Sequence, residues 1–365
     1  MNRKVLVGLG FVVALLLLSL LGPAGFIVGL ATALAPVPVY VTLALWLDRN
    51  EPEPGALLAR AFTWGMVVAS LSAILMNTAA SAFVQLTLGL SAIVGHRVAT
   101  LLVSPVFEEI FKGLAILFVF RHNRDEFNNV VDGAIYASMV GLGFATTENV
   151  LYYGNAALHG HLAAVFATRG VASPFAHPFF TAMTGIGFGL ARDARQRTAR
   201  ISRIATGLAA AITLHFLWNA AATAHLLVYA YIFLMAPTFA ALLLLLRRSL
   251  ARERAMMRER VIAEQESAGL SNGELTTLCG GPGVRPQSTW RRYLPVRTPQ
   301  RRHAVALYEA RRAAVELAFA CWHAECAGRP VSPRVAILRE NYLRACAEWR
   351  AQRGHAATTD EENTT

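Results

Sequence analysis

The sequence has few charged residues, almost no lysine and little cysteine. Charged side chains make up 16% of the 365 residues, whereas a soluble globular protein carries about 25%. Only Lys4 and Lys112 are lysines, and the 4 cysteines all lie after residue 278. This composition excludes an intrinsically disordered chain and a disulfide-stabilised scaffold. It also argues against a single soluble domain.

Long apolar runs dominate the rest of the sequence. Hydrophobic residues make up 55% of the chain, and the mean hydropathy is +0.42. A helix that spans a bilayer needs about 20 mostly apolar residues. We therefore predict an all-α fold, a polytopic membrane bundle of about eight transmembrane helices. The runs that carry this prediction are residues 5–22, 25–47, 56–80, 98–120, 130–153, 174–191, 203–223 and 226–246.

The arginines predict the orientation of the bundle. If the runs alternate, the basic clusters all fall on one side, and the other side carries only Arg97 and Arg169. Because basic loops stay in the cytoplasm, both termini are predicted to be cytoplasmic. The excess of arginine over lysine indicates a GC-rich bacterial genome, and hence a multi-pass protein of the bacterial plasma membrane. Residues 1–24 alternatively fit a signal peptide, which would leave seven spans with the same orientation.

The chain changes character after residue 250. Residues 1–250 form the predicted membrane domain, and residues 251–300 combine a charged helix with a linker rich in glycine and proline. Residues 301–365 are predicted to form a cytoplasmic helical hairpin with a disordered end. Acidic residues alternate with the arginines of this C-terminal tail, so we expect a solvated surface and no nucleic-acid partner.

Ionisable side chains lie inside four of the apolar runs, where charge is costly. One run holds Glu108, Glu109 and Lys112 within five residues, so a single lysine faces two carboxylates. Taken one at a time, the glutamates and the lysine could form a buried structural ion pair, and each histidine could be a hydrogen-bonded core residue. When depth is measured from the outer end of each helix, however, all these ionisable groups lie in the outer half of the bilayer. There they can converge on one polar cavity. The later runs contribute Glu148, His177, His215 and Asn219.

Carboxylates and imidazoles in one cavity allow two hydrolytic chemistries. In the first they bind zinc, which lowers the pKa of a bound water to about 7. In the second, a buried glutamate deprotonates water directly, while histidine and asparagine stabilise the oxyanion. The sequence lacks the His-Glu-x-x-His motif of soluble zinc proteases, and the choice between the two chemistries stays open.

Four motifs, in order on successive runs, resemble those of the PrsW intramembrane proteases, which are related to the CAAX prenyl-protease and bacteriocin-processing superfamily. By this resemblance Glu108, Glu109 and His177 would be the core catalytic positions, completed by Glu148 and His215. If a metal is bound, the resemblance implies that its ligands are Glu108, Glu148, His177 and His215. Prenyl proteases carry histidine at the position of Glu148, which keeps the catalytic type open. The motifs are Glu108-Glu109-Ile110-Phe111-Lys112, Phe144-x-x-x-Glu148-Asn149, His177-x-x-x-Thr181 and His215-x-x-Trp218-Asn219, within a resemblance over roughly residues 30–245.

The resemblance implies an intramembrane endopeptidase with a membrane-protein substrate in the lipid bilayer. In this family such cleavage is associated with the site-1 cut of a single-pass anti-sigma factor. In the working mechanism Glu108 or Glu109 activates a water, and Lys112 tunes the adjacent carboxylate. His177 orients the water or binds the metal, while His215 and Asn219 polarise the scissile carbonyl.

Two other functions use the same residues differently. Buried glutamate, lysine and histidine also serve proton-coupled transporters and ion relays. Against a relay, the ionisable groups gather on one side, Asp132 alone extends toward the cytoplasm, and no inverted repeat is evident. A non-catalytic scaffold whose tail recruits partners would leave two adjacent buried carboxylates without a purpose.

Overall fold

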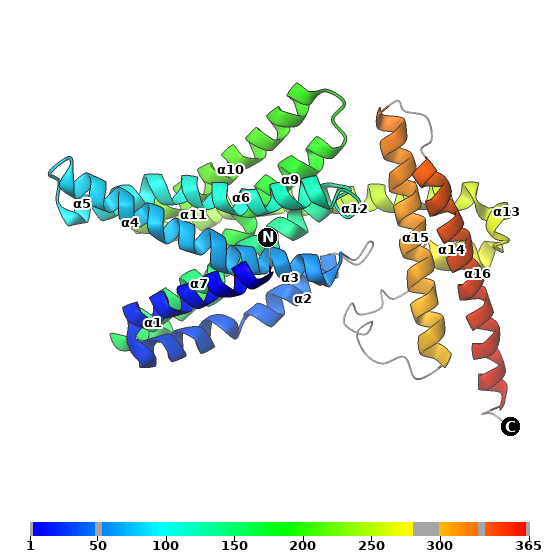
Figure 1. Ribbon diagram of the computed structural model, residues 1–365, viewed down its shortest axis with the longest axis horizontal. Coiled ribbons are helices and arrows are strands. Elements are labelled where there is room, and N and C mark those ends of the chain that lie inside the picture. The colour runs from blue at the N-terminus through cyan, green and yellow to red at the C-terminus, as the bar shows by residue number, and fades with distance from the viewer. Residues whose placement is uncertain (1–2, 48–52, 280–298, 328–332, 363–365) are drawn as a thin grey trace. The chain divides into compact units, whose positions relative to one another are not determined.

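The computed structural model describes residues 3–47, 53–279, 299–327 and 333–362 (Figure 1), and all regular secondary structure in these segments is helical. The predicted all-α fold is therefore confirmed for the described residues. The chain divides into two compact units. Unit 1 comprises Met1–Leu47 and Glu53–Leu246, and unit 2 comprises Asp48–Pro52 and Arg247–Thr365.

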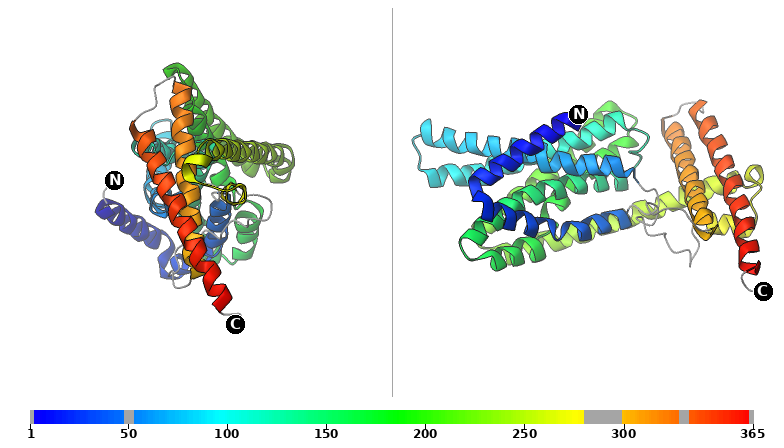
Figure 2. Two further views of the ribbon diagram at one scale, coloured as in Figure 1. Left: turned by 90° about the vertical axis from the view of Figure 1, so that its right-hand side faces the viewer. Right: turned by 60° about the horizontal axis from the view of Figure 1, so that its bottom comes forward.

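The first helices of unit 1 contain a reversal of the chain. Gly22 interrupts α1 with φ 63° and ψ 172°, a conformation that glycine adopts without a Cβ clash. The ribbon of α1 folds back on itself (Figures 1 and 2). Val13 and Leu17, before the reversal, are buried in a cluster with Val150 of α7, so this segment is part of the packed bundle. The elements are α1 (Arg3–Leu34), α2 (Val37–Leu47), α3 (Gly55–Thr63), the π-helical η1 (Trp64–Ala69) and α4 (Ser70–Leu86).

Helix α7 is the most enclosed of the long apolar helices of unit 1. This helix packs against α1, α3 and η1 as well as α9, and 94% of its most apolar stretch is buried. Its first turn is fixed by a capping box, in which Asn129 and Asp132 each bond the backbone of the other. The elements are α5 (Ala92–Val98), η2 (Ala99–Val103), α6 (Ser104–His122), α7 (Val130–Leu158), α8 (Leu162–Phe166), η3 (Ala167–Ala172), α9 (Ala176–Arg192), α10 (Arg197–Thr223), α11 (Leu227–Ala230), η4 (Tyr231–Met235) and α12 (Ala236–Ala263).

Five stretches of the described chain are long and apolar enough to cross a membrane. The first has 44 residues, about 66 Å if straight against a hydrocarbon core of about 30 Å, and the reversal at Gly22 divides it. Helices α6 and α9 are not among these five stretches. Helix α6 carries too many ionisable residues, and α9, with 17 residues, is too short. The predicted total of eight spans stays a prediction. The five stretches are Lys4–Leu47, Gly55–Leu86, Val130–Leu158, Arg197–Thr223 and Leu227–Ala263.

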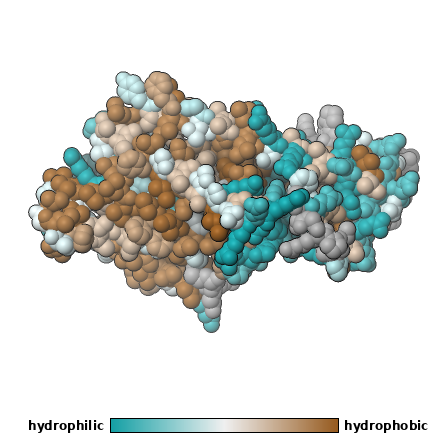
Figure 3. Space-filling model, turned by 90° about the horizontal axis from the view of Figure 1, so that it is seen from above, coloured by the Kyte–Doolittle hydropathy of each residue, from teal (hydrophilic) through white to brown (hydrophobic). Residues whose placement is uncertain are grey.

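Unit 2 has a hydrophobic core of its own. Leu278, Leu317 and Trp349 are almost fully buried in one cluster that includes Met257 and Val261 of α12. Among the described residues, only Ile262 and Ile337 are exposed large hydrophobics of this unit. Figure 3 shows that the surface of unit 2 is largely hydrophilic and that of unit 1 largely hydrophobic. The further elements are α13 (Gln265–Ala268), α14 (Asn272–Leu278), α15 (Pro299–Ala327) and α16 (Pro333–Glu362).

Part of the predicted linker is folded. Within residues 251–300, the helix α14 begins at a capping box in which Ser271 and Glu274 bond each other's backbone. Residues 280–298 of that linker lie outside the described residues. Helix α16 continues to Glu362, past the point where the composition predicts disorder.

Candidate active site

Helix α6 places its three ionisable side chains in the interior of unit 1. Glu108, Glu109 and Lys112 are 3%, 0% and 0% exposed. The Lys112 Nζ donates to Glu109 Oε1 at 2.9 Å and to Glu108 Oε2 at 3.3 Å, and it lies 3.8 Å from the centre of the Phe144 ring. One lysine therefore binds both carboxylates, as their spacing of three and four residues on a helix allows.

Glu109 joins helices α9 and α10 to α6. Its Oε2 accepts a hydrogen bond from Thr181 Oγ1 at 3.0 Å, and its Oε1 lies 3.0 Å from His215 Nδ1. An ionised carboxylate only accepts hydrogen bonds, so Nδ1 of His215 carries the proton. The Nε2 of His215 then presents a lone pair, and this atom lies 3.8 Å from Glu108 Oε2. A carboxylate that orients a histidine in this way is typical of metal sites.

His177 lies between a lysine and a third carboxylate. Its Nδ1 is 3.2 Å from Lys112 Nζ, and its Nε2 is 2.7 Å from Glu148 Oε2. Because an ammonium group can only donate, Nδ1 accepts and Nε2 donates its proton to Glu148. Both ring nitrogens of His177 are thus engaged.

Arg169 belongs to the site, whereas its position in the sequence indicates only the orientation of the bundle. This arginine of η3 pairs with the carboxylate of Glu148, and its Nε donates to Asn149 Oδ1 at 2.8 Å. Its guanidinium also lies 3.8 Å from the centre of the Tyr152 ring. A signal was available, since a lone arginine in an otherwise uncharged outer segment needs a partner.

A pocket of about 890 Å³ opens onto part of this cluster. Glu108, Glu148 and His177 line it, whereas Glu109 and Lys112 do not. The two adjacent glutamates therefore differ in position: Glu108 faces the pocket and Glu109 lies behind it.

The polar neighbours of the two histidines act across helices. Thr181 and Asn219 each follow a histidine by four residues, a spacing at which each could bond the histidine on its own helix. Thr181 instead bonds Glu109, and Asn219 Nδ2 donates to the Thr100 carbonyl at 3.0 Å while lining the pocket. Asn219 therefore fixes α10 to η2. Ser104, which the sequence analysis also missed, donates to Glu108.

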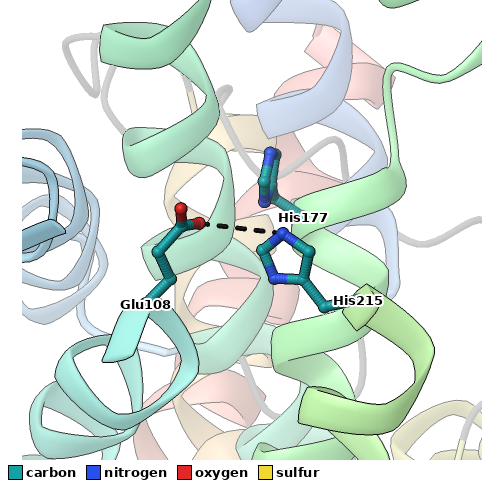
Figure 4. A group of neighbouring side chains, drawn as sticks. All are labelled: Glu108, His177 and His215. Atoms are coloured by element: carbon teal, nitrogen blue, oxygen red, sulfur yellow. Dashed lines mark ion pairs between the residues drawn. The ribbon is translucent and has the colours of Figure 1, made fainter. Parts of the chain in front are cut away.

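Three of the four residues named as metal ligands form a compact donor group. One ligand atom from each of Glu108, His177 and His215 lies within 4.8 Å of the others, and Figure 4 shows the two imidazoles facing the carboxylate. Two histidines and a glutamate are the protein ligands of several catalytic zinc sites, so the donor set fits a metal by type. Glu148 is outside this group because Arg169 and His177 hold it. A metal would have to displace Lys112 or Glu148 from His177.

Charge also favours a cation at this site. Three carboxylates, the buried Glu108 and Glu109 and the partly buried Glu148, face two basic residues, Lys112 and Arg169. With both histidines neutral, one negative charge is left over in a low-dielectric interior, where an uncompensated charge is costly. A proton or a metal cation would balance it.

Asp132, the residue that a relay toward the cytoplasm would need, has a structural partner. Its Oδ2 accepts from the backbone nitrogens of Asn128 and Asn129 at 2.6 and 3.1 Å. This carboxylate caps α7, which accounts for its burial without transport.

Comparison with known proteins gives consistent matches. The family model described as PrsW family intramembrane metalloprotease matches residues 53–242, a range that contains every side chain of the cluster. A Protease PrsW of Geobacillus kaustophilus is 27% identical over 165 residues, which cover 45% of this chain and 67% of that relative. A Protease PrsW of Oceanobacillus iheyensis is 36% identical over 88 residues, 24% of this chain and 38% of the relative. No solved structure matches the chain.

Proposed function

Because the chain belongs to the PrsW family of intramembrane metalloproteases, we propose that it cleaves a peptide bond of a membrane-bound protein at the pocket lined by Glu108 and His177. The chain is thus a membrane-embedded hydrolase. The substrate class that the resemblance implies is a single-pass anti-sigma factor, and the cut is the site-1 cut that releases a sigma factor. Family membership supports this substrate.

The observation that carries the proposal is the position of Glu108. Glu108 is 3% exposed, its carboxylate faces a pocket large enough for a peptide, and it lies beside two imidazoles. Without a metal, a carboxylate in that environment can take a proton from water and return it to the leaving amine. With a metal, the same carboxylate would be one of its ligands.

The other residues orient Glu108 and the histidines. Lys112 fixes both carboxylates of α6 and balances one of them. Glu109 binds Nδ1 of His215 and so holds its Nε2 toward Glu108. Glu148 binds Nε2 of His177 and so fixes the orientation of that ring. Asn219, on the pocket wall, can bind a peptide carbonyl through the part of its amide that Thr100 does not use.

Glu108, His177 and His215 would hold the metal, and zinc is the ion that their donor types favour. When bound there, a zinc ion supplies Lewis acidity, which polarises a carbonyl and makes water more acidic. Glu148, the fourth residue of the ligand set that the resemblance implies, would support His177 as an outer partner.

For the cellular setting we propose a multi-pass protein of the bacterial plasma membrane with both termini in the cytoplasm. The arginine distribution supports this orientation. Residues 1–250 would then form the protease domain, and residues 251–365 would be a cytoplasmic appendage attached through α12.

The proposal is tested by cleavage in reconstituted liposomes. Wild type and Glu108→Gln are compared on a panel of single-pass proteins that includes anti-sigma factors. We expect wild type to cut at least one of them and Glu108→Gln to lose at least about a thousandfold of that rate, as when a catalytic group is removed. Equal cleavage by both proteins would refute the assignment of Glu108.

Metal removal separates the two catalytic types. With a metal at the site, a chelator should abolish cleavage by wild type, and added Zn²⁺ should restore it. Full activity in the chelator, with no metal found in the purified protein by elemental analysis, would favour direct water activation by Glu108.

A further inference from the structure

The Lys112 ammonium has a complete set of hydrogen-bond acceptors. An ammonium group carries three N–H donors and no acceptor. The Lys112 Nζ lies 2.9 Å from Glu109 Oε1, 3.3 Å from Glu108 Oε2 and 3.2 Å from His177 Nδ1. The Phe144 ring adds a cation–π contact at 3.8 Å from its centre. Each N–H of this fully enclosed lysine, which is 0% exposed, therefore has its own acceptor.

Two of these three acceptors belong to the donor group that fits a metal. That group consists of Glu108, His177 and His215. Because Nε2 of His177 donates to Glu148, the lone pair of that ring is on Nδ1, and a neutral imidazole binds a metal through its lone pair. Lys112 therefore takes up the histidine atom that a metal would use, together with one oxygen of Glu108.

The charges of the cluster also set Lys112 against a metal ion. With both histidines neutral, three carboxylates and two basic side chains leave one negative charge. A divalent ion added to this set would make it positive and would lie close to the ammonium, which repels it. Without Lys112 two negative charges are left over, and a divalent ion balances them.

We propose that Lys112 is a built-in cation that competes with metal ions for Glu108 and His177, so that a metal binds the site only by displacing the ammonium. The inference rests on the proposed function, in which these two residues form the catalytic centre. In the absence of a metal the ammonium holds both side chains in place. The affinity of the chain for Zn²⁺ is therefore lower than its donor set alone would give.

Metal titration of the purified full-length protein in detergent tests the competition. The affinity for Zn²⁺ is measured against a chromophoric chelator for wild type, Lys112→Met and Arg169→Met. Methionine is unbranched, as lysine is, and removes the ammonium. Arg169→Met is the charge-matched control, because it removes the same charge from the cluster, whereas Arg169 pairs with Glu148, which lies outside the donor group.

We expect Lys112→Met to bind Zn²⁺ at least about tenfold more tightly than Arg169→Met. Wild type and Arg169→Met must both break charge-assisted hydrogen bonds of the ammonium to bind the ion, and Lys112→Met need not. Equal affinities in the two variants would mean that net charge alone sets the affinity and would overturn the inference. Zinc binding by Lys112→Met that is no tighter than in wild type would overturn it as well.

Two further variants make this result specific. Adding Glu108→Gln to Lys112→Met removes a ligand of the donor group and should abolish the gain in affinity. A gain that survives would place the ion elsewhere, such as at the cysteines of unit 2, and would overturn the inference. Lys112→Gln, whose amide keeps hydrogen-bond donors for the carboxylates, should also bind Zn²⁺ more tightly than wild type, and it replaces Lys112→Met if that protein does not fold.

The lysine content of the chain gives a second readout, on wild type itself. Lys4 and Lys112 are its only lysines, so protein labelled with ¹³C at the lysine ε-carbon gives one NMR signal from each, and Lys4→Arg assigns them. Saturation with Zn²⁺ should shift the Lys112 signal and leave that of the exposed Lys4 in place. Zinc binding that moves neither signal would overturn the inference. Cleavage in liposomes is measured separately, so either failure is distinguishable from failure of the protease function.

Discussion

At the scale of single residues, adjacent carboxylates have different positions. Glu108 faces the pocket, and Glu109 is enclosed by Lys112, Thr181 and His215. The order of the motifs predicts that these groups converge, but adjacency in sequence does not reveal which glutamate faces the pocket. That depends on the rotation of α6 against α9 and α10.

Replacement of the enclosed glutamate should cost less than replacement of Glu108. Glu109→Gln keeps an acceptor for Thr181 but loses the charge that orients His215, and such outer partners contribute about 10- to 100-fold. We expect cleavage to fall by that factor, against loss of at least about a thousandfold in Glu108→Gln. The measurement is kcat/KM in liposomes, and a larger loss in Glu109→Gln than in Glu108→Gln would reverse the two roles.

Arg169 shows what sequence patterns miss at this scale. Its pairing with Glu148 joins residues 21 positions apart in the chain and requires η3 to lie against α7. Arg169 lies in a short connecting segment, outside the four motifs that carry the catalytic residue types. A carboxylate in an apolar run without a basic residue on its own helix was the available clue.

In unit 2, Glu274 predicts a response to acid. The backbone N–H of Ser271, 2.9 Å away, lowers the pKa of Glu274, and Arg350 and Arg353 at 3.4 Å lower it further. A depressed folded-state pKa stabilises the fold above the unfolded value of about 4.3, and this contribution is lost as the pH falls through the folded pKa. Between pH 6 and pH 3, the amide protection factors of residues 271–278, which correct for the intrinsic exchange rate at each pH, should therefore fall more in wild type than in Glu274→Gln. The same fall in both proteins would contradict this.

At the scale of helices, the close packing of α7 against α9 positions His177. A Cβ on Gly141 of α7 would lie 2.6 Å from the His177 carbonyl oxygen, so the two backbones touch there. The sequence places glycines in this run and thereby predicts close approach of a neighbouring helix. It does not show that the neighbour is α9 at the turn that carries His177.

Gly141→Ala should therefore impair catalysis without adding or removing a polar group. The methyl group must push α9 away, and a displacement of about 1 Å at a catalytic group can cost about a hundredfold. We expect at least a tenfold loss of cleavage. Gly8→Ala is the control, because its Cβ would meet nothing within 4 Å. Unchanged activity in Gly141→Ala would show that α9 tolerates the shift.

Helix boundaries were predictable to different degrees. The apolar run that ends at residue 22 meets the reversal at Gly22. The helix α14, by contrast, lies in a segment whose glycine and proline content predicts a linker. Its capping box of Ser271 and Glu274 was a readable local signal, which the composition of the surrounding residues outweighed.

At the scale of the whole molecule, the chain separates into two compact units, and all residues of the catalytic cluster lie in unit 1. Composition predicts a change of character near residue 250. It does not predict that unit 2 has a buried core of its own around Trp349.

Truncation tests whether the tail takes part in catalysis. A chain ending at residue 264 keeps all of unit 1 and the complete helix α12. We expect it to insert into the membrane and to cleave within about twofold of the full-length rate, because no residue of the site is removed. A loss of more than tenfold, with the truncated protein still folded by circular dichroism, would give the tail a role in activity.

The enclosure of α7 has a consequence for biogenesis. Of the five stretches long and apolar enough to cross a membrane, α7 has the lowest mean hydropathy, 1.3, and the largest buried share, 94%. Glu148 makes the transfer of α7 into lipid less favourable, and the partners of this carboxylate, Arg169 and His177, come after α7 in the chain. We therefore expect stable integration of α7 to depend on the segments that follow it.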